Sequence, residues 1–445
     1  CWALYTVNGS LPAAEGPRFA LCGEWKVQHC RSTRSRQNTG TAWRASTGRW
    51  STRTPPVDLD AVRLYRLGRL RSELRRHDVA GLLLFDQINT RYATDATNMQ
   101  VWSSHYETRC VFVALDGPVV LFDYADHPHL AEGLPTVDEY RVMPSFYYFA
   151  AGPHAEDRAR RFADQIADLM RRHGGGNRRL AVDRLSHLGT DALRAQGLQL
   201  LDGLPIAEHA RAIKSPGEVA LMRASLAVCE EGCRAMRAAL VPGITENALW
   251  AKLHETNIRL GGEWIETRLL SSGPRTNPWF RECSMRRIEA GDMVSFDTDL
   301  IGPYGYCSDI SRAWVCGDRP TDAQRRLYAA AAEQVEHNIA ILAPGLSFRE
   351  VAERSWPVPE AFLSRRYPSL IHGVGLADEY PSIKYLPDFA AKGYDGILAP
   401  GMTLCVESFI GAEGGREGVK LEEQVLITEA GVERLSAYPL ETEWL

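Results

Sequence analysis

Three aspartates in one short segment of the sequence have the spacing of a cation-binding hairpin. Residues 293–300 alternate between apolar and polar types, which predicts a strand, and side chains two positions apart on a strand share a face. Asp297 and Asp299 are therefore expected to point the same way, and the turn signal at 303–305 predicts a returning strand that carries Asp309. Because like charges repel, these neighbouring carboxylates predict either a bound cation or solvated surface groups.

Three further segments favour the bound cation. His372 precedes a glycine-rich turn, Glu407 lies in an apolar run, and Glu422 lies in a second apolar run. Carboxylates inside apolar strands need partners. Five carboxylates and one imidazole can hold two divalent ions, whose four positive charges nearly balance the five negative ones. Oxygen-rich ligation with one imidazole favours manganese, iron or zinc over a thiolate-bound metal.

A second domain, expected at 211–445, must position these residues. The segment 211–218 marks its start, because Ser215 is a suitable N-cap, Pro216 a suitable first helical residue and Glu218 a capping-box partner. A long helix is predicted over 218–240, and strand patterns follow it. Before this domain, alternating helix and strand patterns predict an α/β domain over 57–210.

Residues 1–56 differ in composition from the rest of the chain. They hold eight Lys and Arg against two acidic residues and show little hydrophobic periodicity. This composition predicts an N-terminal arm that is disordered or misannotated, and an arm that reaches a partner subunit is the functional alternative. Position 1 is not Met and no basic-then-apolar signal peptide follows, so we expect a processed, truncated or misassigned start.

The composition also narrows the class of protein. A chain of 445 residues has room for two or three domains. A net charge of −5 and a pI near 6.2 argue against a nucleic-acid partner, and no apolar run is long enough for a membrane span. The ten cysteines form no CxxC pair, which favours free thiols in a reducing compartment, and we expect a cytoplasmic protein.

The motifs together resemble the pita-bread metallohydrolases, which include prolidase, Xaa-Pro aminopeptidase, methionine aminopeptidase and creatinase. The matching segments are 211–218, 297–309, 372–375, 400–407 and 420–422. The resemblance implies an α+β fold, in which a pita-bread catalytic domain follows a creatinase/prolidase-like α/β domain that commonly helps to form a dimer. It also implies that Asp309, His372, Glu407 and Glu422 are metal ligands.

The sequence departs from the peptidases of this fold in ways that bear on the reaction. Asp297 and Asp299 stand twelve and ten residues before Asp309, whereas the peptidases place their first Asp eleven before. The segment 272–280 lacks the His that the peptidases carry, and Asp378 stands where they carry another His. Both imidazoles that manage the substrate in the peptidases are missing, which argues against peptide hydrolysis, while the metal ligands remain.

A closer resemblance is to the metal-dependent dimethylsulfoniopropionate lyases of the DddP type. It runs from about residue 59 to 439 and includes the segments 89–95, 97–100, 262–268, 272–280, 296–302 and 400–407. It implies two divalent ions, with iron as the expected metal, on Asp297, Asp299, Asp309, His372, Glu407 and Glu422. It further implies Asp378 as the base, a small zwitterionic substrate, and Trp102 and Tyr367 in the substrate channel. A homodimer is also implied.

The chemistry of such a lyase fits these residues. β-Elimination removes a proton next to the substrate carboxylate and releases dimethyl sulfide, leaving acrylate, and it needs no attacking water. Asp378 must then act as a base, and we expect burial or neighbouring acids such as Glu379 to raise its pKa. Trp102, Tyr367 and Trp279 are candidates for holding the sulfonium by cation–π attraction.

Each of these assignments has an alternative. The alternative function is an Xaa-Pro dipeptidase or aminopeptidase, and a third hypothesis is a non-enzymatic protein that uses the cleft for binding. Asp378 could be a solvated turn residue, Tyr367 a structural residue before a proline, and Trp102 and Trp279 aromatic residues of the core or of a dimer interface.

Overall fold

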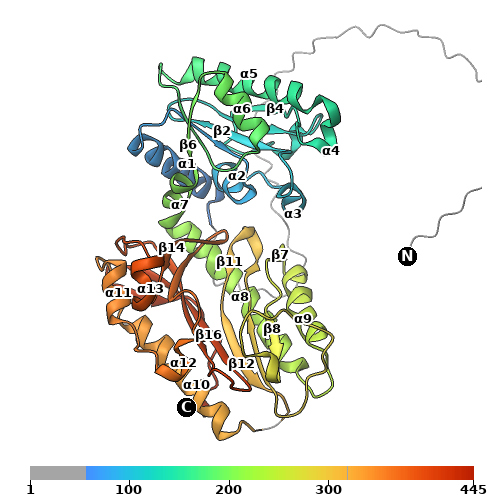
Figure 1. The fold of residues 1–445 in the computed structure, drawn as a ribbon. Helices are drawn as coiled ribbons and strands as arrows, with labels where there is room; N and C mark the ends of the chain where they lie inside the picture. The colour runs from blue at the N-terminus through green and yellow to red at the C-terminus, as the bar shows by residue number, and fades with distance from the viewer. Residues whose placement is uncertain (1–56, 318, 445) are drawn as a thin grey trace, which may run out of the picture. The chain divides into compact units, whose positions relative to one another are not determined.

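The computed structural model describes residues 57–317 and 319–444, so the predicted arm at 1–56 lies outside the described residues. The first part of the described chain is an α/β module around a six-stranded sheet with the order β4-β3-β2-β1-β5-β6 (Figure 1). The strands of this module are β1 (Gly81–Leu84), β2 (Cys110–Ala114), β3 (Val119–Asp123), β4 (Glu139–Val142), β5 (Arg179–Val182) and β6 (Gln199–Asp202). Its helices are α1 (Leu59–Arg76), α2 (Gln87–Thr94), α3 (Gln100–Ser103), α4 (Tyr148–Ala151), α5 (Ala155–His173), α6 (His187–Ala195) and α7 (Leu204–Ala212).

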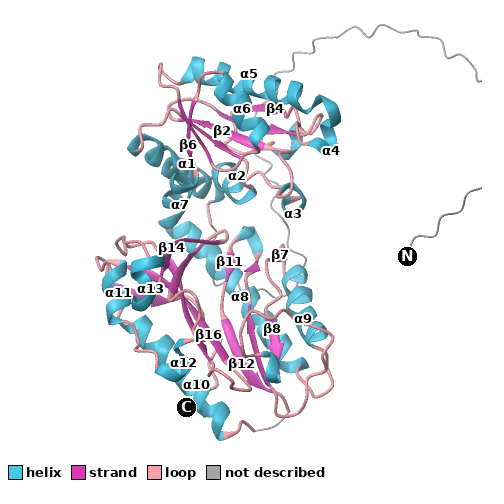
Figure 2. Ribbon diagram, in the orientation of Figure 1, coloured by secondary structure: helices cyan, strands magenta, loops and turns pink. Residues whose placement is uncertain are grey.

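The second part carries the predicted ligands on three sheets, ordered β11-β10-β7, β12-β9-β8 and β14-β13-β15-β16-β17. The strands are β7 (Trp264–Ile265), β8 (Leu270–Ser272), β9 (Met293–Asp297), β10 (Leu300–Ile301), β11 (Cys307–Ser308), β12 (Ser311–Val315), β13 (Ile371–Val374), β14 (Asp378–Ile383), β15 (Thr403–Ile410), β16 (Val419–Thr428) and β17 (Gly431–Arg434). The helices are α8 (Pro216–Ala239), α9 (Glu246–Arg259), α10 (Asp322–Ala340), α11 (Phe348–Arg354), α12 (Glu360–Leu363) and α13 (Leu386–Lys392). Figure 2 shows α8 and α9 on one side of these strands and α10 on the other.

The start of α8 confirms the helix predicted after residue 215. The Ser215 side chain accepts a hydrogen bond from the backbone N–H of Glu218. The Glu218 carboxylate accepts a hydrogen bond from the backbone N–H of Ser215, so both halves of the capping box are present. Pro216 occupies the first helical position, where its missing N–H costs nothing. The segment 211–218 thus fixes the residue at which α8, the first helix of the second part, begins.

The predicted aspartate hairpin is present, but the single strand predicted over 293–300 is wrong. β9 ends at Asp297, and Asp299 has a φ of 36°, which interrupts the extended backbone before β10 begins. On the returning side, Asp309 lies between β11 and β12. β9 pairs antiparallel with β12 and β10 with β11, so the two breaks face each other and direct the aspartates to one place.

The two long strands β15 and β16 bring the glutamates together. Their antiparallel register places Glu407 directly opposite Glu422, so both carboxylates leave the same face of the sheet. Both strands are almost entirely buried, and α10 packs against them. This arrangement confirms the strands predicted around both residues.

Two general properties of the described residues follow. Across residues 57–317 and 319–444, no helix is both long enough and apolar enough to cross a membrane.

Seven described cysteines are buried free thiols: Cys110, Cys229, Cys233, Cys283, Cys307, Cys316 and Cys405.

Candidate metal centre

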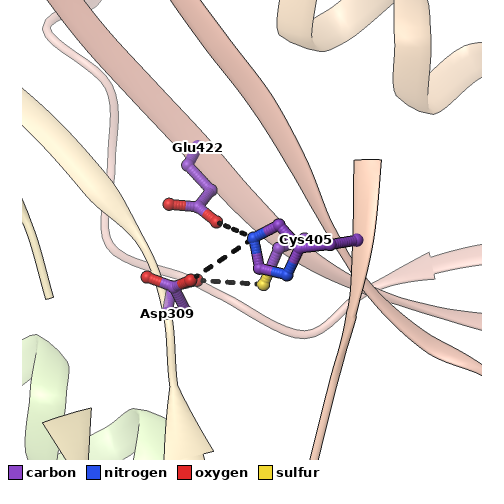
Figure 3. Close-up of side chains that lie close together, drawn as sticks. Asp309, Cys405 and Glu422 are labelled. Atoms are coloured by element: carbon purple, nitrogen blue, oxygen red, sulfur yellow. Dashed lines mark hydrogen bonds and ion pairs between the residues drawn. The ribbon is translucent and has the colours of Figure 1, made fainter. Parts of the chain in front are cut away.

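The six ligands predicted from the sequence lie in one buried cluster. Three groups have candidate ligand atoms that all lie within 4.8 Å of one another: Asp309, His372, Cys405 and Glu422; Asp297, Glu407 and Glu422; and Asp297, Asp299 and Asp309. The groups share members, so they form one continuous set of donors. Figure 3 shows that the side chains of Asp309, from the link between β11 and β12, Cys405, from β15, and Glu422, from β16, converge on one place.

His372 presents a ring nitrogen to this cluster. Its Nδ1 lies 3.0 Å from the backbone carbonyl oxygen of Gly373 and donates a hydrogen bond to it. Its Nε2 lies 3.1 Å from Glu407 Oε1, 3.6 Å from Glu422 Oε1 and 3.7 Å from Asp309 Oδ2. A hydrogen bond that fixes the proton on one ring nitrogen leaves the other free to bind a metal, as is usual for metal-binding histidines.

The carboxylates of the cluster are buried and repel one another. Burial, followed by the negative charge of neighbouring carboxylates, raises the pKa values of Asp299, Asp309 and Glu422. Glu422 Oε1 is also buried without a hydrogen-bond partner. A divalent ion would remove the repulsion and satisfy this oxygen, so the donor set fits the metal site that the sequence predicts.

One carboxylate of the cluster behaves differently because a lysine lies beside it. Burial would raise the pKa of Asp297, but the Lys420 ammonium and the hydroxyl of Ser311 lower it to about 2. Lys420 Nζ is 3.2 Å from Asp297 Oδ2, and Ser311 Oγ is 2.7 Å from Asp297 Oδ1. Asp297 therefore stays ionised, while its neighbours compete for protons.

Asp378 lies at the edge of the cluster, at the first residue of β14. Its side chain is half exposed, and its Oδ1 lies 3.7 Å from Nδ1 of His372. It lines a cavity of about 510 Å³, together with Tyr367 and Phe280. Burial raises the pKa of Asp378, His372 opposes this shift, and the carboxylates of Asp297 and Glu407 add to it.

The expectation that Glu379 raises the pKa of Asp378 is wrong. The Glu379 carboxylate is fully buried and lies between the guanidinium of Arg211, at 3.1 Å, and the ammonium of Lys214. These two cations compensate its charge, and Glu379 is not among the causes of the Asp378 shift. Glu379 instead fixes the start of β14 to the segment 211–218.

The three predicted aromatic residues lie in different environments. The ring of Tyr367 lines the cavity, 5.4 Å between centroids from Phe280. Trp279 is buried and packs against Phe409, with ring centres 5.8 Å apart, so it does not line this cavity. Trp102 is partly exposed beside Tyr106, also away from the cavity lining. Phe280, the residue after Trp279, has a φ of 72° and lines the cavity in its place.

Sequence reasoning missed four residues at this site: Cys405, Lys420, Ser311 and Phe280. Strand spacing could have found two of them, since Cys405 is two residues before Glu407 and Lys420 two residues before Glu422. Cys405 belongs to one ligand group, and burial raises its thiol pKa well above the ordinary value, so it is a neutral thiol here.

Comparison with known proteins gives two family models and close relatives. Residues 220–429 match metallopeptidase family M24, and residues 66–213 match the creatinase/prolidase N-terminal domain. The fold resembles an Xaa-Pro dipeptidase from Bacillus anthracis, with a TM-score of 0.69 and 21% identity over 85% of this chain and 98% of that one. These matches confirm the α+β class with a pita-bread domain after a creatinase-like domain.

Two relatives are much closer in sequence. The chain is 46% identical to the dimethylsulfoniopropionate lyase DddP of Roseovarius nubinhibens, over 88% of this chain and 90% of the relative. It is 45% identical to the protein of the same name from Roseobacter denitrificans, over 86% and 87%. Identity at this level, across nearly the whole length of both proteins, means that the chain belongs to the DddP family of dimethylsulfoniopropionate lyases.

Proposed function

We propose that this protein cleaves dimethylsulfoniopropionate to dimethyl sulfide and acrylate by β-elimination, with Asp378 as the base. The observation that carries the proposal is the place of Asp378, which lines the cavity beside the metal-ligand cluster but takes no part in its ligand groups. A carboxylate there is free to accept a proton, whereas the carboxylates inside the cluster are directed toward a cation.

The elimination balances with the groups at the site. Asp378 accepts the proton from the carbon next to the substrate carboxylate, the electron pair of that C–H bond forms the new double bond, and the C–S bond breaks. Dimethyl sulfide leaves as a neutral molecule with the electron pair of the C–S bond. Divalent ions on Asp297, Asp299, Asp309, His372, Glu407 and Glu422 would supply positive charge that stabilises the carbanion developing beside the substrate carboxylate.

The aromatic wall of the cavity supports binding of the sulfonium. Tyr367 and Phe280 line the cavity together with Asp378, and a cation near an aromatic face gains roughly 0.5–2 kcal/mol. One cation already lies near Tyr367, because Lys420 Nζ is 4.6 Å from its ring centre. We therefore assign to Phe280 the role that the sequence suggested for Trp279.

The nature of the metal and the cellular setting are also proposals. Two divalent ions agree with the number of carboxylates, and iron is expected from the family resemblance, while the donors also accept manganese or zinc. We propose that the protein acts in the cytoplasm, since its seven described cysteines are buried free thiols.

A headspace assay tests the proposed reaction. Purified, metal-loaded protein should release dimethyl sulfide and acrylate from dimethylsulfoniopropionate in equal amounts, and a chelator should stop the release until metal is added back. The alternative, an Xaa-Pro dipeptidase, is supported by the fold of the Bacillus anthracis protein. Turnover of an Xaa-Pro dipeptide without release of dimethyl sulfide would replace the lyase with that alternative.

A further inference from the structure

A buried ammonium group lies among the predicted metal ligands. Lys420 is on β16, two residues before Glu422, so both side chains leave the same face of the strand. Its Nζ lies 2.5 Å from Glu407 Oε2, 2.7 Å from Ser311 Oγ, 3.1 Å from Glu422 Oε2 and 3.2 Å from Asp297 Oδ2. Oxygen atoms thus surround the ammonium much as ligands surround a metal ion.

The glutamates divide their oxygens between Lys420 and His372. Oε2 of Glu407 and Oε2 of Glu422 face Lys420, while Oε1 of each faces Nε2 of His372. The cluster therefore has two positions for positive charge, one beside the imidazole and one beside Asp297. The ammonium lies at the second position, where Asp297, Glu407 and Glu422 form a ligand group of their own.

We propose that Lys420 is a built-in cation of the metal centre, which competes with the metal ion on the Asp297 side but not with the ion on the His372 side. The charges support this role. The five ligand carboxylates carry more negative charge than a single divalent ion offsets, and Lys420 offsets part of the remainder before a second ion binds. The two metal ions then bind in sequence, the His372 side first, because the second ion must share its carboxylates with the ammonium and is repelled by it.

Metal titration tests this proposal without reference to the lyase reaction. The metal-free full chain is titrated with Zn²⁺ by calorimetry, as wild type, Lys420→Met and the control Lys392→Met, whose lysine is mostly exposed. Wild type and K392M should bind in two steps of different affinity. In K420M the second Zn²⁺ should bind more tightly, with a dissociation constant lower by about tenfold or more. The dissociation constant of the first Zn²⁺ should change by less than about threefold. Equal or weaker binding of the second ion in K420M would overturn the proposal.

Folding of the variant supplies a second test. K420M leaves buried carboxylates without their cation, so its metal-free form should melt at a lower temperature than the wild type, and Zn²⁺ should restore most of the difference. Lys420→Arg keeps the charge and should keep the two-step titration. A K420M variant that Zn²⁺ does not restore would show a packing role instead and would contradict the proposal. These measurements report metal binding alone, so a failed lyase assay would leave them interpretable.

Discussion

Asp378 and the predicted metal ligands face opposite nitrogens of the His372 ring. Nε2 of His372 faces the ligand carboxylates, and Nδ1 faces Asp378 at 3.7 Å. Asp378, the proposed base, therefore lies next to the predicted metal ligands but belongs to none of their groups. A substrate carboxylate drawn toward the metal centre would bring its neighbouring carbon toward Asp378, which is the geometry that proton abstraction needs.

Phe280 should affect binding of the sulfonium more than binding of a neutral molecule of the same shape. Phe280→Leu should raise the KM for dimethylsulfoniopropionate by about 2- to 30-fold, the equivalent of a lost cation–π contact. The inhibition constant of 4-methylpentanoate, which has a carbon in place of the sulfonium sulfur, should change by less than about twofold. Steady-state kinetics measure both constants.

The matched control for this experiment is Phe280→Tyr, which keeps an aromatic face and should bind the substrate as the wild type does. If F280L weakens the binding of dimethylsulfoniopropionate and of 4-methylpentanoate equally, then Phe280 contributes only apolar contact area and the cation–π assignment is wrong.

Asp183 should make the stability of the protein depend on pH. Its carboxylate is buried and accepts the backbone N–H of Phe85 at 2.8 Å and the side-chain amide of Asn89 at 2.9 Å. Burial, opposed by these hydrogen bonds, raises its pKa to about 6. The folded state then binds a proton that the unfolded state releases, so stability falls by roughly 3 kcal/mol as pH rises from about 4 to 6 and is constant above that.

Urea denaturation at several pH values measures this effect. Asp183→Asn should not lose stability in this way, because the amide does not titrate. The free energy of unfolding of the variant relative to the wild type should therefore rise by that amount as pH increases from 4 to 6. A constant difference between the two proteins across this range would show that Asp183 has an ordinary pKa in the folded state.

At the scale of elements, the sequence predicted the strands better than the breaks between them. The apolar runs around Glu407 and Glu422 are long, so both strands followed from the sequence pattern, whereas the pairing of the two glutamates did not. The break at Asp299 did not, because a positive φ at a non-glycine residue has no clear sequence signal. The sequence also suggested Trp279, whereas the structure places Phe280 at the cavity. Which of two neighbouring rings faces a cavity depends on the shape of the turn, and the sequence did not reveal that shape.

The segment that joins the two parts of the chain also holds the strand that carries Asp378, the proposed base. Arg211 pairs with Glu379, the neighbour of Asp378, and its guanidinium also donates to the side chain of Asn89 in α2. Lys214 binds the same glutamate from the other side. The start of β14 is therefore held through buried charges, whose partners lie in different elements.

Removing Arg211 should loosen this start of β14. Arg211→Met should lower kcat by about tenfold with unchanged metal content, because Asp378 loses its fixed position, and it should destabilise the protein by roughly 1–3 kcal/mol. Arg211→Lys keeps a positive charge beside Glu379, so it should lose less stability than R211M. An R211K variant that is as unstable as R211M in thermal unfolding would contradict a charge-based role.

At the scale of the whole molecule, aromatic side chains gather in one surface patch. We define the aromatic patch as Trp102, Tyr106, Tyr147, Tyr148 and Phe149. Tyr148 is 78% exposed and Phe149 77%, which is unusual for large apolar side chains. We propose that this patch takes part in the homodimer expected from the family resemblance, which would bury Trp102.

Light scattering tests the dimer. The wild type should have twice the mass of one chain, and Tyr148→Ser combined with Phe149→Ser should shift it toward the monomer at micromolar concentration. Ile258→Ser, which changes an exposed apolar residue on α9, should leave the mass unchanged. A variant of the patch that remains dimeric would place the interface elsewhere.

The central claim is that Asp378 removes the substrate proton while the neighbouring cluster holds the metal. It is tested most directly by measuring metal content and dimethyl sulfide release on the same preparations of wild type, Asp378→Asn and the exposed-residue control Asp116→Asn. The account predicts equal metal in all three, release by wild type and D116N, and a loss of about 10²- to 10⁴-fold in kcat for D378N. Release by metal-loaded D378N at the wild-type rate would contradict it.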